Sequence, residues 1–524
     1  MRGKMLVIGL DGACWDLIGE WVENGELPNI KKLRDGGCWG PLGSCIPPIT
    51  CPAWHCYATG KNPGKLGVFW WEHLDLENRR VIIPNSKSFK SRKLWDYLND
   101  ARYRTGIIGM PTTYPPQKVD GFMIAGGPDC GDTGYTYPKE LESWLKQEFD
   151  YKPHPQISVT DRNKRGIAIE EVHNLIAANF EVAKVLMKKN PVDFLQVTSF
   201  HINGPLQHYF YNGKPTRKAW KLIDDKIGKL VPNFEYILIM SDHGTSPMIK
   251  NFFINAWLEN EEYLVTRRTF YDFLFKFGFS RDRISRLLVK LHLTRFLRRF
   301  EITQRIARQI PDQFGDLGDH AGEGTFSRIN WQKTRVIGSP QGPLYINKEI
   351  IKNKAEYERL RAELINKLEK LKDPETNKNV IQKVYKREEI YHGSYAQQAP
   401  DLVALDADEY HNRGGIGKAN ILEKSEWKGN NARYGLFLFA GPGIRQGQYI
   451  DSVTIFDLAP TILHLMNISI PKDMDGRVIK EIFMQDSELA KREVVYQKVA
   501  DKTEREKERI KMAVKRLQAG GSEL

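Results

Sequence analysis

The amino-acid sequence predicts an α/β fold in which a mixed, mostly parallel central sheet is sandwiched between helices. Short β-rich runs alternate with helical segments along most of the chain, the order of elements that produces a parallel sheet. Several of these runs are apolar on both faces, which is typical of strands covered by helices. The predicted strands are 4–10, 104–110, 194–200, 236–241, 343–347, 401–406 and 434–440, and the clearest helices are 167–189 and 217–230.

Two segments are predicted as additions to this single domain, which spans residues 1–483. A helical insertion at about 259–328 is expected to cap the sheet, and its stretch 281–309 is strongly basic. Leucine and isoleucine recur there at helical spacing, so one face is apolar and the other cationic. A helix packed on the core and a contact with a membrane surface both remain open for it. Residues 484–524 predict a charged C-terminal helix, either on the surface or in a homo-oligomer contact.

The composition is that of an ordinary globular protein, with 41% hydrophobic and 27% charged residues. No apolar run approaches the ~18 residues that a membrane-spanning helix needs. The first apolar run is short and has no small-residue cleavage site, which argues against a secretory signal. The six cysteines include no CxxC pair, so we expect reduced thiols and a cytoplasmic location.

The charge balance suggests that the protein has an affinity for anions. The chain holds 78 Lys and Arg against 65 Asp and Glu, a formal net charge of +13. Phosphorylated substrates, acidic lipid surfaces and nucleic acid are all anionic partners that this positive charge would attract. No nucleic-acid recognition motif accompanies the basic patch, so specific nucleic-acid binding is not expected.

Acidic residues and a histidine follow two of the predicted strands. Asp11 comes directly after strand 4–10, and Asp242 and His243 come directly after strand 236–241. Ligands of open α/β sheets bind at the carboxyl ends of the strands, so these side chains are expected to converge. Two carboxylates and an imidazole suit Zn²⁺, or Mn²⁺ with added water. A lone strand-end aspartate is more often a helix cap.

A proline-rich turn between these strands carries a candidate nucleophile. Thr50 lies just ahead of Pro52, where a helix can begin. Its hydroxyl would then lie near unpaired backbone N–H groups, which favour an anion. Metal coordination would lower the pKa of this hydroxyl and so supply the alkoxide. A plain helix-capping threonine explains Thr50 equally well when the turn is considered alone.

These motifs together resemble the type I phosphodiesterase/nucleotide pyrophosphatase family of the alkaline phosphatase superfamily. The resemblance runs over roughly residues 4–483. It is carried by Val7-Ile8-Gly9-Leu10-Asp11-Gly12, Pro48-Ile49-Thr50-Cys51-Pro52-Ala53-Trp54, Ser241-Asp242-His243-Gly244, Ile254-Asn255-Ala256-Trp257-Leu258, Leu344-Tyr345-Ile346-Asn347, Gly441-Pro442-Gly443-Ile444 and Asp457-Leu458-Ala459-Pro460-Thr461. It implies an alkaline-phosphatase-like fold and a metal held by Asp11, Asp242 and His243 that also touches Thr50.

The resemblance also implies a second metal site, which is degraded in this chain. Relatives build it from an Asp-x-x-x-His pair and a later histidine. His208 matches the first imidazole, but Gly204, with Asn203 beside it, stands at the acid position, and Asn431 stands at the later histidine. A neutral amide is a weak ligand at such a site, so we expect one ion, and a second is uncertain. His201 and His320 are candidate replacement ligands.

The resulting functional prediction is a metal-dependent phosphodiesterase or phosphohydrolase that forms a covalent Thr50-phosphoryl intermediate. Its substrate would be a small phosphate ester or a nucleotide, and Trp71 and Tyr114 are candidate pocket residues. Core packing explains Trp71 equally well, and a rigid turn explains Tyr114 better than a pocket does. Two alternatives stay open. The protein could be a single-metal phospho- or phosphoethanolamine-type transferase, or a catalytically weak ligand-binding scaffold on the same fold.

Overall fold

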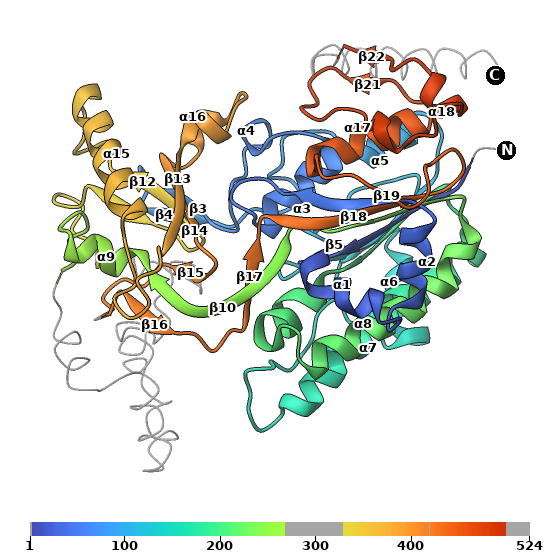
Figure 1. Ribbon diagram of the computed structural model, residues 1–524, viewed down its shortest axis with the longest axis horizontal. Helices are drawn as coiled ribbons and strands as arrows, with labels where there is room; N and C mark the ends of the chain where they lie inside the picture. Colours follow the sequence, from blue (N-terminus) through green and yellow to red (C-terminus); the bar gives the residue numbers. More distant parts are fainter. Residues whose placement is uncertain (1–2, 268–327, 419, 499–524) are drawn as a thin grey trace, which may run out of the picture.

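The computed structural model describes residues 3–267, 328–418 and 420–498. A ten-stranded mixed sheet forms the centre of this part of the chain, in the order β19-β2-β18-β9-β1-β8-β5-β6-β7 with β20 beside β2 (Figure 1). Its strands are β1 (Met5–Leu10), β2 (Cys38–Gly43), β5 (Thr105–Pro111), β6 (Gly121–Gly126), β7 (Thr136–Tyr137), β8 (Phe194–Ser199), β9 (Tyr236–Met240), β18 (Tyr434–Ala440), β19 (Gln448–Tyr449) and β20 (Val453–Thr454).

Helices cover both faces of this sheet, because its central strands are apolar on both sides. In β1, Met5 and Val7 pack into one hydrophobic cluster, whereas Leu6, Ile8 and Leu10 pack into another. The first cluster is covered by α3 (Thr50–Thr59), α5 (Leu94–Asp100) and α17 (Leu458–Leu465), and the second by α1 (Trp15–Glu23), α2 (Pro28–Asp35), α6 (Glu140–Phe149), α7 (Arg165–Lys189) and α8 (Lys214–Leu230) (Figure 1). The predicted α/β sandwich is confirmed.

The parallel core of the sheet brings distant strand ends to one edge. β1 lies between β8 and β9 and runs parallel to both, with Leu10 opposite Ser199 and Gly9 opposite Met240. β5 and β6 continue the parallel set, whereas β18 runs antiparallel to both β9 and β2. Residues that follow β1, β8 and β9 therefore meet at the same edge.

A second lobe holds two of the strands that the sequence assigned to the central sheet. Residues 343–347 and 401–406 form β12 (Pro343–Ile346) and β14 (Leu402–Asp406) of a separate antiparallel sheet, ordered β11-β12-β14-β13. Both faces of β14 are nonetheless covered, since Leu402 and Ala404 pack in the lobe's main cluster and Val403 packs in a smaller one. An apolar run shows that a strand is buried, but it does not show which sheet the strand joins. The lobe's other elements are β11 (Val336–Gly338), β13 (Ile381–Lys386), α9 (Ile254–Asn260), α15 (Lys354–Glu369) and α16 (Arg387–Ile390).

The long strand β10 (Gly244–Phe253) carries the chain from the central sheet to this lobe (Figure 1). It pairs with β15 (Glu409–Arg413), β16 (Leu422–Lys424) and β17 (Gly429–Ala432), which return from the lobe. Two small elements, the helix α4 (Pro63–Leu66) and the hairpin of β3 (His73–Asp75) and β4 (Arg80–Ile82), complete this side.

The two predicted additions fall largely outside the described residues. The insertion predicted at about 259–328 is described only at its ends, and its basic stretch 281–309 lies outside the described part. Residues 484–498 differ from the predicted C-terminal helix: they form only α18 (Glu488–Lys491) and then β22 (Tyr496–Gln497). Pairing of β22 with β21 (Ile470–Pro471) holds this stretch in an extended conformation. Among the described residues, no helix is both long and apolar enough to span a bilayer.

Candidate active site

Three candidate ligands come together at the carboxyl edge of the central sheet. Asp11 follows β1, and Asp242 and His243 lie between β9 and β10. Their side chains are at most 1% exposed. His243 Nε2 lies 3.2 Å from Asp242 Oδ2 and 3.7 Å from Asp11 Oδ1. One ligand atom from each residue fits within a group no more than 4.8 Å across.

The hydrogen bonding of His243 sets which ring nitrogen faces this cluster. Its Nδ1 lies 2.8 Å from the carbonyl oxygen of Gly244, which can only accept a hydrogen bond. Nδ1 therefore carries a proton, and Nε2 is the ring nitrogen that faces both carboxylates. A neutral imidazole held in this tautomer by its other nitrogen is the usual form of a metal-ligating histidine.

Each of the two carboxylates has one oxygen that accepts a hydrogen bond and one that accepts none from the described residues, an arrangement that suits a divalent cation. Asp11 Oδ2 accepts from Trp54 Nε1 at 3.1 Å, and Asp242 Oδ1 accepts from the Gly12 N–H at 3.2 Å. The other oxygen of each is buried without a hydrogen-bond partner among the described residues. Burial, and then the charge of Asp242, raises the pKa of Asp11 well above its usual range, and burial also raises the pKa of Asp242. A cation bound by these oxygens and His243 would remove both penalties.

Gly12 lets the backbone after β1 lie close to neighbouring segments of the same chain. It has a φ of +68°, and a Cβ there would lie 2.5 Å from Asn203 Oδ1 and 2.6 Å from Thr245 Oγ1. Any other residue would be strained and would clash. The glycine therefore lets its N–H reach Asp242 while its carbonyl accepts from the Thr245 hydroxyl at 2.7 Å.

Thr50 stands at the first position of α3, beside the three candidate ligands. All ten residues of this helix are buried, and Thr50 itself is 5% exposed. Its Oγ1 lies 2.9 Å from His243 Nε2. Pro52 has no N–H and the Ala53 N–H donates to the Ile49 carbonyl, which leaves the N–H groups of Thr50 and Cys51 without a partner within the helix to favour a negative group there. A divalent cation, when bound, lowers the pKa of a hydroxyl that it touches.

The candidate second half-site is a closed network of neutral groups. His208 Nε2 donates to Asn431 Oδ1 at 3.0 Å, and Asn431 Nδ2 donates to the Pro48 carbonyl at 3.1 Å. Asn203 Oδ1 accepts from Gln207 Nε2 at 3.2 Å, and its Nδ2 lies 3.4 Å from Asn431 Oδ1. Burial lowers the pKa of His208 to about 4, so its ring is neutral near pH 7. The charge that would bind a second cation is missing here.

The remaining predicted site residues lie elsewhere. His201 Nε2 donates to the Pro153 carbonyl at 3.2 Å, which keeps its ring outside the Asp11–Asp242–His243 cluster. His320 lies outside the described residues. Trp71 packs half-buried against the core around α3, and the Tyr114 hydroxyl donates to the Thr133 carbonyl at 3.1 Å.

Two residues that support the candidate site were given no role by the sequence. Trp54 follows Thr50 by one helical turn and therefore faces the same way, a spacing that could have identified it. Its ring packs on Gly9, where a Cβ would lie 2.6 Å from the indole. Ser44 Oγ donates to the Asp242 carbonyl at 2.6 Å, and no sequence signal indicated this contact.

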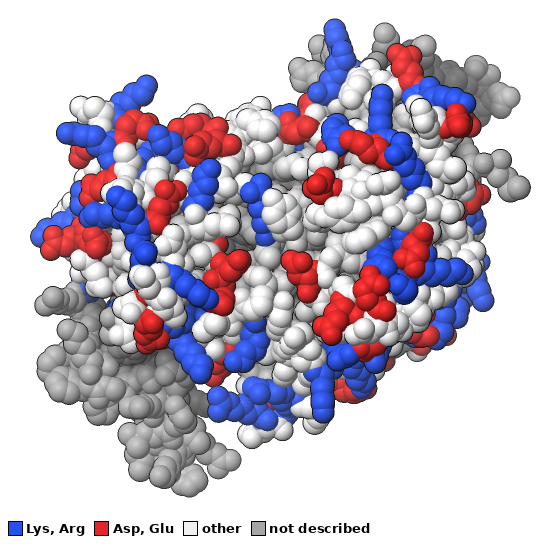
Figure 2. Space-filling model, in the orientation of Figure 1, with Lys and Arg blue, Asp and Glu red and all other residues white. Residues whose placement is uncertain are grey.

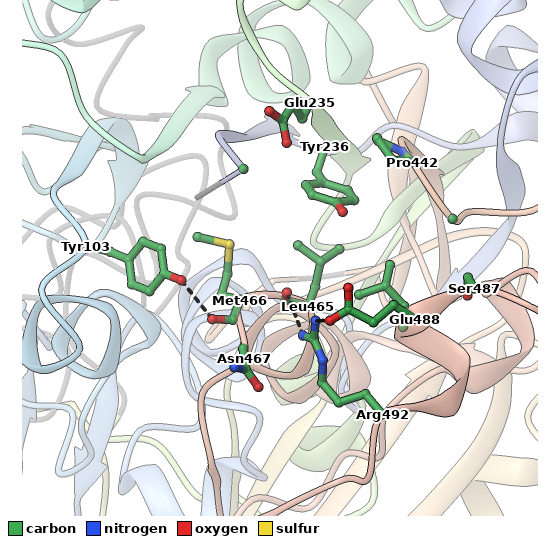
Figure 3. Close-up of a pocket in the computed structure, with 13 residues that line it drawn as sticks. Tyr103, Glu235, Tyr236, Pro442, Leu465, Met466, Asn467, Ser487, Glu488 and Arg492 are labelled. Carbon is green, nitrogen blue, oxygen red and sulfur yellow. Dashed lines mark hydrogen bonds and ion pairs between the residues drawn. The ribbon is translucent and has the colours of Figure 1, made fainter. Parts of the chain in front are cut away.

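A cavity of about 630 Å³ lies beside this site, between the sheet edge and the second lobe. Pro48, Ile49 and Asn431 line one end of it, and neither Trp71 nor Tyr114 is among the described residues that line it. Another cavity, of about 480 Å³, lies at the opposite ends of β1 and β9. There the Arg492 guanidinium donates to the Leu465 carbonyl and pairs with Glu488 (Figure 3). It also donates to the His464 carbonyl.

Comparison with solved structures shows the same fold. Human ectonucleotide pyrophosphatase/phosphodiesterase 5 is 13% identical, with a TM-score of 0.51, over 92% of this chain and 100% of that one. Phosphonoacetate hydrolase from Sinorhizobium meliloti, in complex with phosphonoformate, is 12% identical with a TM-score of 0.56, over 89% of this chain and 95% of that one. No match was found among curated proteins.

The family assignment comes from a match over most of the sequence. The family model for type I phosphodiesterase / nucleotide pyrophosphatase matches residues 5–432. This family usually depends on a divalent metal, and the Asp11–Asp242–His243 cluster is a candidate site for one. Family and fold together support a phosphohydrolase of the phosphodiesterase or pyrophosphatase type. The chain belongs to the type I phosphodiesterase / nucleotide pyrophosphatase family.

Proposed function

We propose that this protein is a phosphodiesterase or phosphohydrolase that uses one divalent ion and forms a covalent intermediate on Thr50. The observation that carries the proposal is the position of the Thr50 hydroxyl. It lies 2.9 Å from His243 Nε2, beside two buried carboxylate oxygens that have no hydrogen-bond partner among the described residues. Asp11, Asp242 and His243 would hold the ion. Carboxylate and imidazole donors favour Zn²⁺, and Mn²⁺ also fits them.

The reaction would run as a double displacement. Thr50 Oγ1 forms a bond to phosphorus while the bond from phosphorus to the leaving alcohol breaks, and the hydroxyl proton ends on that alcohol. Unpaired backbone N–H groups of the first turn of α3 stabilise the phosphoryl oxygens. Water then attacks the phosphothreonine, which releases the phosphate product and restores the Thr50 hydroxyl.

The neutral half-site changes what surrounds the phosphoryl group. His208, Asn203 and Asn431 carry no charge, so only amide and imidazole dipoles act where relatives have a second cation. Hydrolysis of the intermediate then loses one means of activating water. This observation favours transfer of the phosphoryl group to an alcohol as a second candidate function.

Hydrolysis of bis(p-nitrophenyl) phosphate by protein supplied with Zn²⁺ or Mn²⁺ tests the main proposal. Replacement of Thr50 by alanine removes the nucleophile, so we expect the rate to fall by about 10³-fold or more. The exposed Thr160 offers a matched control, and Thr160→Ala is expected to keep the wild-type rate. Turnover of Thr50→Ala at the wild-type rate would refute the covalent route.

Mass spectrometry of protein quenched during turnover separates hydrolysis from transfer. A phosphorylated peptide containing Thr50 is expected in both cases. If added alcohol clears the phosphothreonine much faster than water does, the protein is a transferase. If alcohol has no effect, it is a hydrolase. A protein that binds no metal and forms no phosphothreonine would instead be a ligand-binding scaffold.

A further inference from the structure

The cavity of about 630 Å³ continues from the turn that carries Thr50 into the second lobe. Pro48 and Ile49, the two residues before Thr50, line its near end. The far end is formed by β14 and β15 and the residues between them. A phosphate ester whose phosphorus lies at Thr50 would therefore place one of its organic groups in this cavity. The inference below rests on the proposed function.

The charge of the cavity is opposite in sign to that of the protein. Four carboxylates, those of Asp16, Asp406, Asp408 and Glu409, line it within the described part of the chain, against the single guanidinium of Arg433. Glu409 is paired with Lys378 at 2.5 Å, which leaves three acids facing one base. The whole chain has a formal net charge of +13, and Lys and Arg are spread among the acids over the face in Figure 2. The acidic lining is therefore a local feature.

The wall of the cavity also contains buried polar atoms that lack a hydrogen bond. His411 is 4% exposed, and its Nδ1 lies 3.8 Å from Asp406 Oδ2, with no hydrogen-bond partner among the described residues. Asp406 Oδ1 is in the same condition, whereas its Oδ2 accepts from the Asn412 N–H at 2.9 Å. Burial raises the pKa of Asp406 to about 7, so a cation beside it would recover an interaction that it otherwise lacks. The unpaired buried carboxylate oxygen of Asp406 calls for a ligand that brings a hydrogen-bond donor.

We propose that this cavity binds the organic group of the phosphate ester and selects one that carries an ammonium group. Such a group brings a positive charge toward Asp406 and Asp408 and an N–H donor for the unpaired Asp406 Oδ1. A substituent with a further phosphate or carboxylate would be repelled by the same residues. The site is therefore suited to esters of amino alcohols and not to nucleoside polyphosphates.

Equilibrium binding of three alkylphosphonates to the metal-loaded protein tests this selectivity without turnover. The probes are 2-aminoethylphosphonate, ethylphosphonate and 3-phosphonopropionate, which share the phosphonate and differ in the charge of the tail. By calorimetry we expect 2-aminoethylphosphonate to bind about tenfold tighter than ethylphosphonate, and 3-phosphonopropionate about tenfold weaker. Equal affinities, or the reverse order, would overturn the proposal.

Variants that each remove one charge test whether the cavity carboxylates cause the preference for the ammonium group. Asp406→Asn and Asp408→Asn are each expected to reduce the preference for the ammonium by at least about threefold, because one attractive charge is lost. Asp408 is exposed, so its replacement leaves the fold intact even if Asp406→Asn does not. Asp225→Asn, on the exposed face of α8, removes the same charge far from the cavity and is expected to keep the preference. A preference that survives Asp408→Asn and Asp406→Asn unchanged would contradict the assignment.

Hydrolysis of the corresponding p-nitrophenyl esters separates this inference from the proposed function. If the esters are cleaved in the same order of preference, both hold. If the phosphonates bind in the expected order and no ester is cleaved, the cavity assignment stands and the proposed reaction fails. If the esters are cleaved without regard to tail charge, the reaction stands and the cavity assignment fails.

Discussion

The two half-sites at the carboxyl edge of the sheet contrast in how their polar atoms are satisfied. In the first, Asp11 and Asp242 each leave one buried oxygen without a hydrogen bond among the described residues, and His243 Nε2 faces both carboxylates. In the second, the side chains of His208 and Asn431 bond to each other, and Asn431 also bonds to the Pro48 carbonyl. The first half-site is fully buried, and in the second Asn203 and His208 are buried whereas Asn431 is partly exposed.

This difference teaches that charge, not burial, separates a cation site from a structural network. Buried acids without partners raise the free energy of the folded protein unless they are protonated or bind a cation. Neutral amides that bond to one another carry no such penalty, and they gain little from an ion. We therefore expect the first half-site to bind metal and the second to stay closed, and three predictions test that expectation.

The largest effect is expected from removing one charge of the first half-site. Asp242→Asn keeps the shape of the side chain but weakens its hold on a divalent cation, so activity is expected to fall by roughly 10³-fold. The same loss should follow when wild-type protein is treated with a chelator. Steady-state hydrolysis of an aryl phosphodiester measures both. Asp451→Asn, at an exposed acid, is the matched control, and equal activity of the two variants would contradict the account.

The second prediction converts the neutral half-site into a charged one. Asn203→Asp combined with Asn431→His puts an acid and an imidazole at two positions whose side chains already meet beside His208. We expect a second ion to bind and hydrolysis to rise by on the order of tenfold. The exposed Asn163 provides Asn163→Asp as a control. If the double variant still binds one ion, the missing charge is not what limits the second site.

The smallest effect is expected from replacing a buried indole, and one indole lies beside each half-site. Trp54 donates to Asp11 Oδ2 at 3.1 Å, and Trp220 donates to Gln207 Oε1 at 3.2 Å. Replacing either by phenylalanine removes one buried hydrogen bond, worth about 1 kcal/mol. Only Trp54→Phe should also weaken metal binding and slow hydrolysis, by about fivefold, because Asp11 then loses its orientation. The prediction fails if Trp220→Phe changes metal affinity as much as Trp54→Phe does.

The sequence predicted the candidate metal ligands, because each of them directly follows an apolar strand. Asp11 and Asp242 converge because β1 and β9 are parallel neighbours, and two apolar runs that each end in an acid already indicate this. The second lobe was not predicted, since β12 and β14 are as apolar as central strands. The acidic cavity was not predicted either. Its walls combine residues from α1, the turn at Thr50 and strands beyond residue 400, and the net charge of +13 favoured the opposite sign.

Metal content of the purified protein tests the central claim most directly. After dialysis against Zn²⁺ or Mn²⁺ and removal of free ion, inductively coupled plasma mass spectrometry gives the number of ions per chain. The contrast between the half-sites predicts one ion in the wild-type protein, one in Asn431→Ala and none in Asp242→Asn. Two ions in the wild-type protein, or one retained by Asp242→Asn, would contradict it.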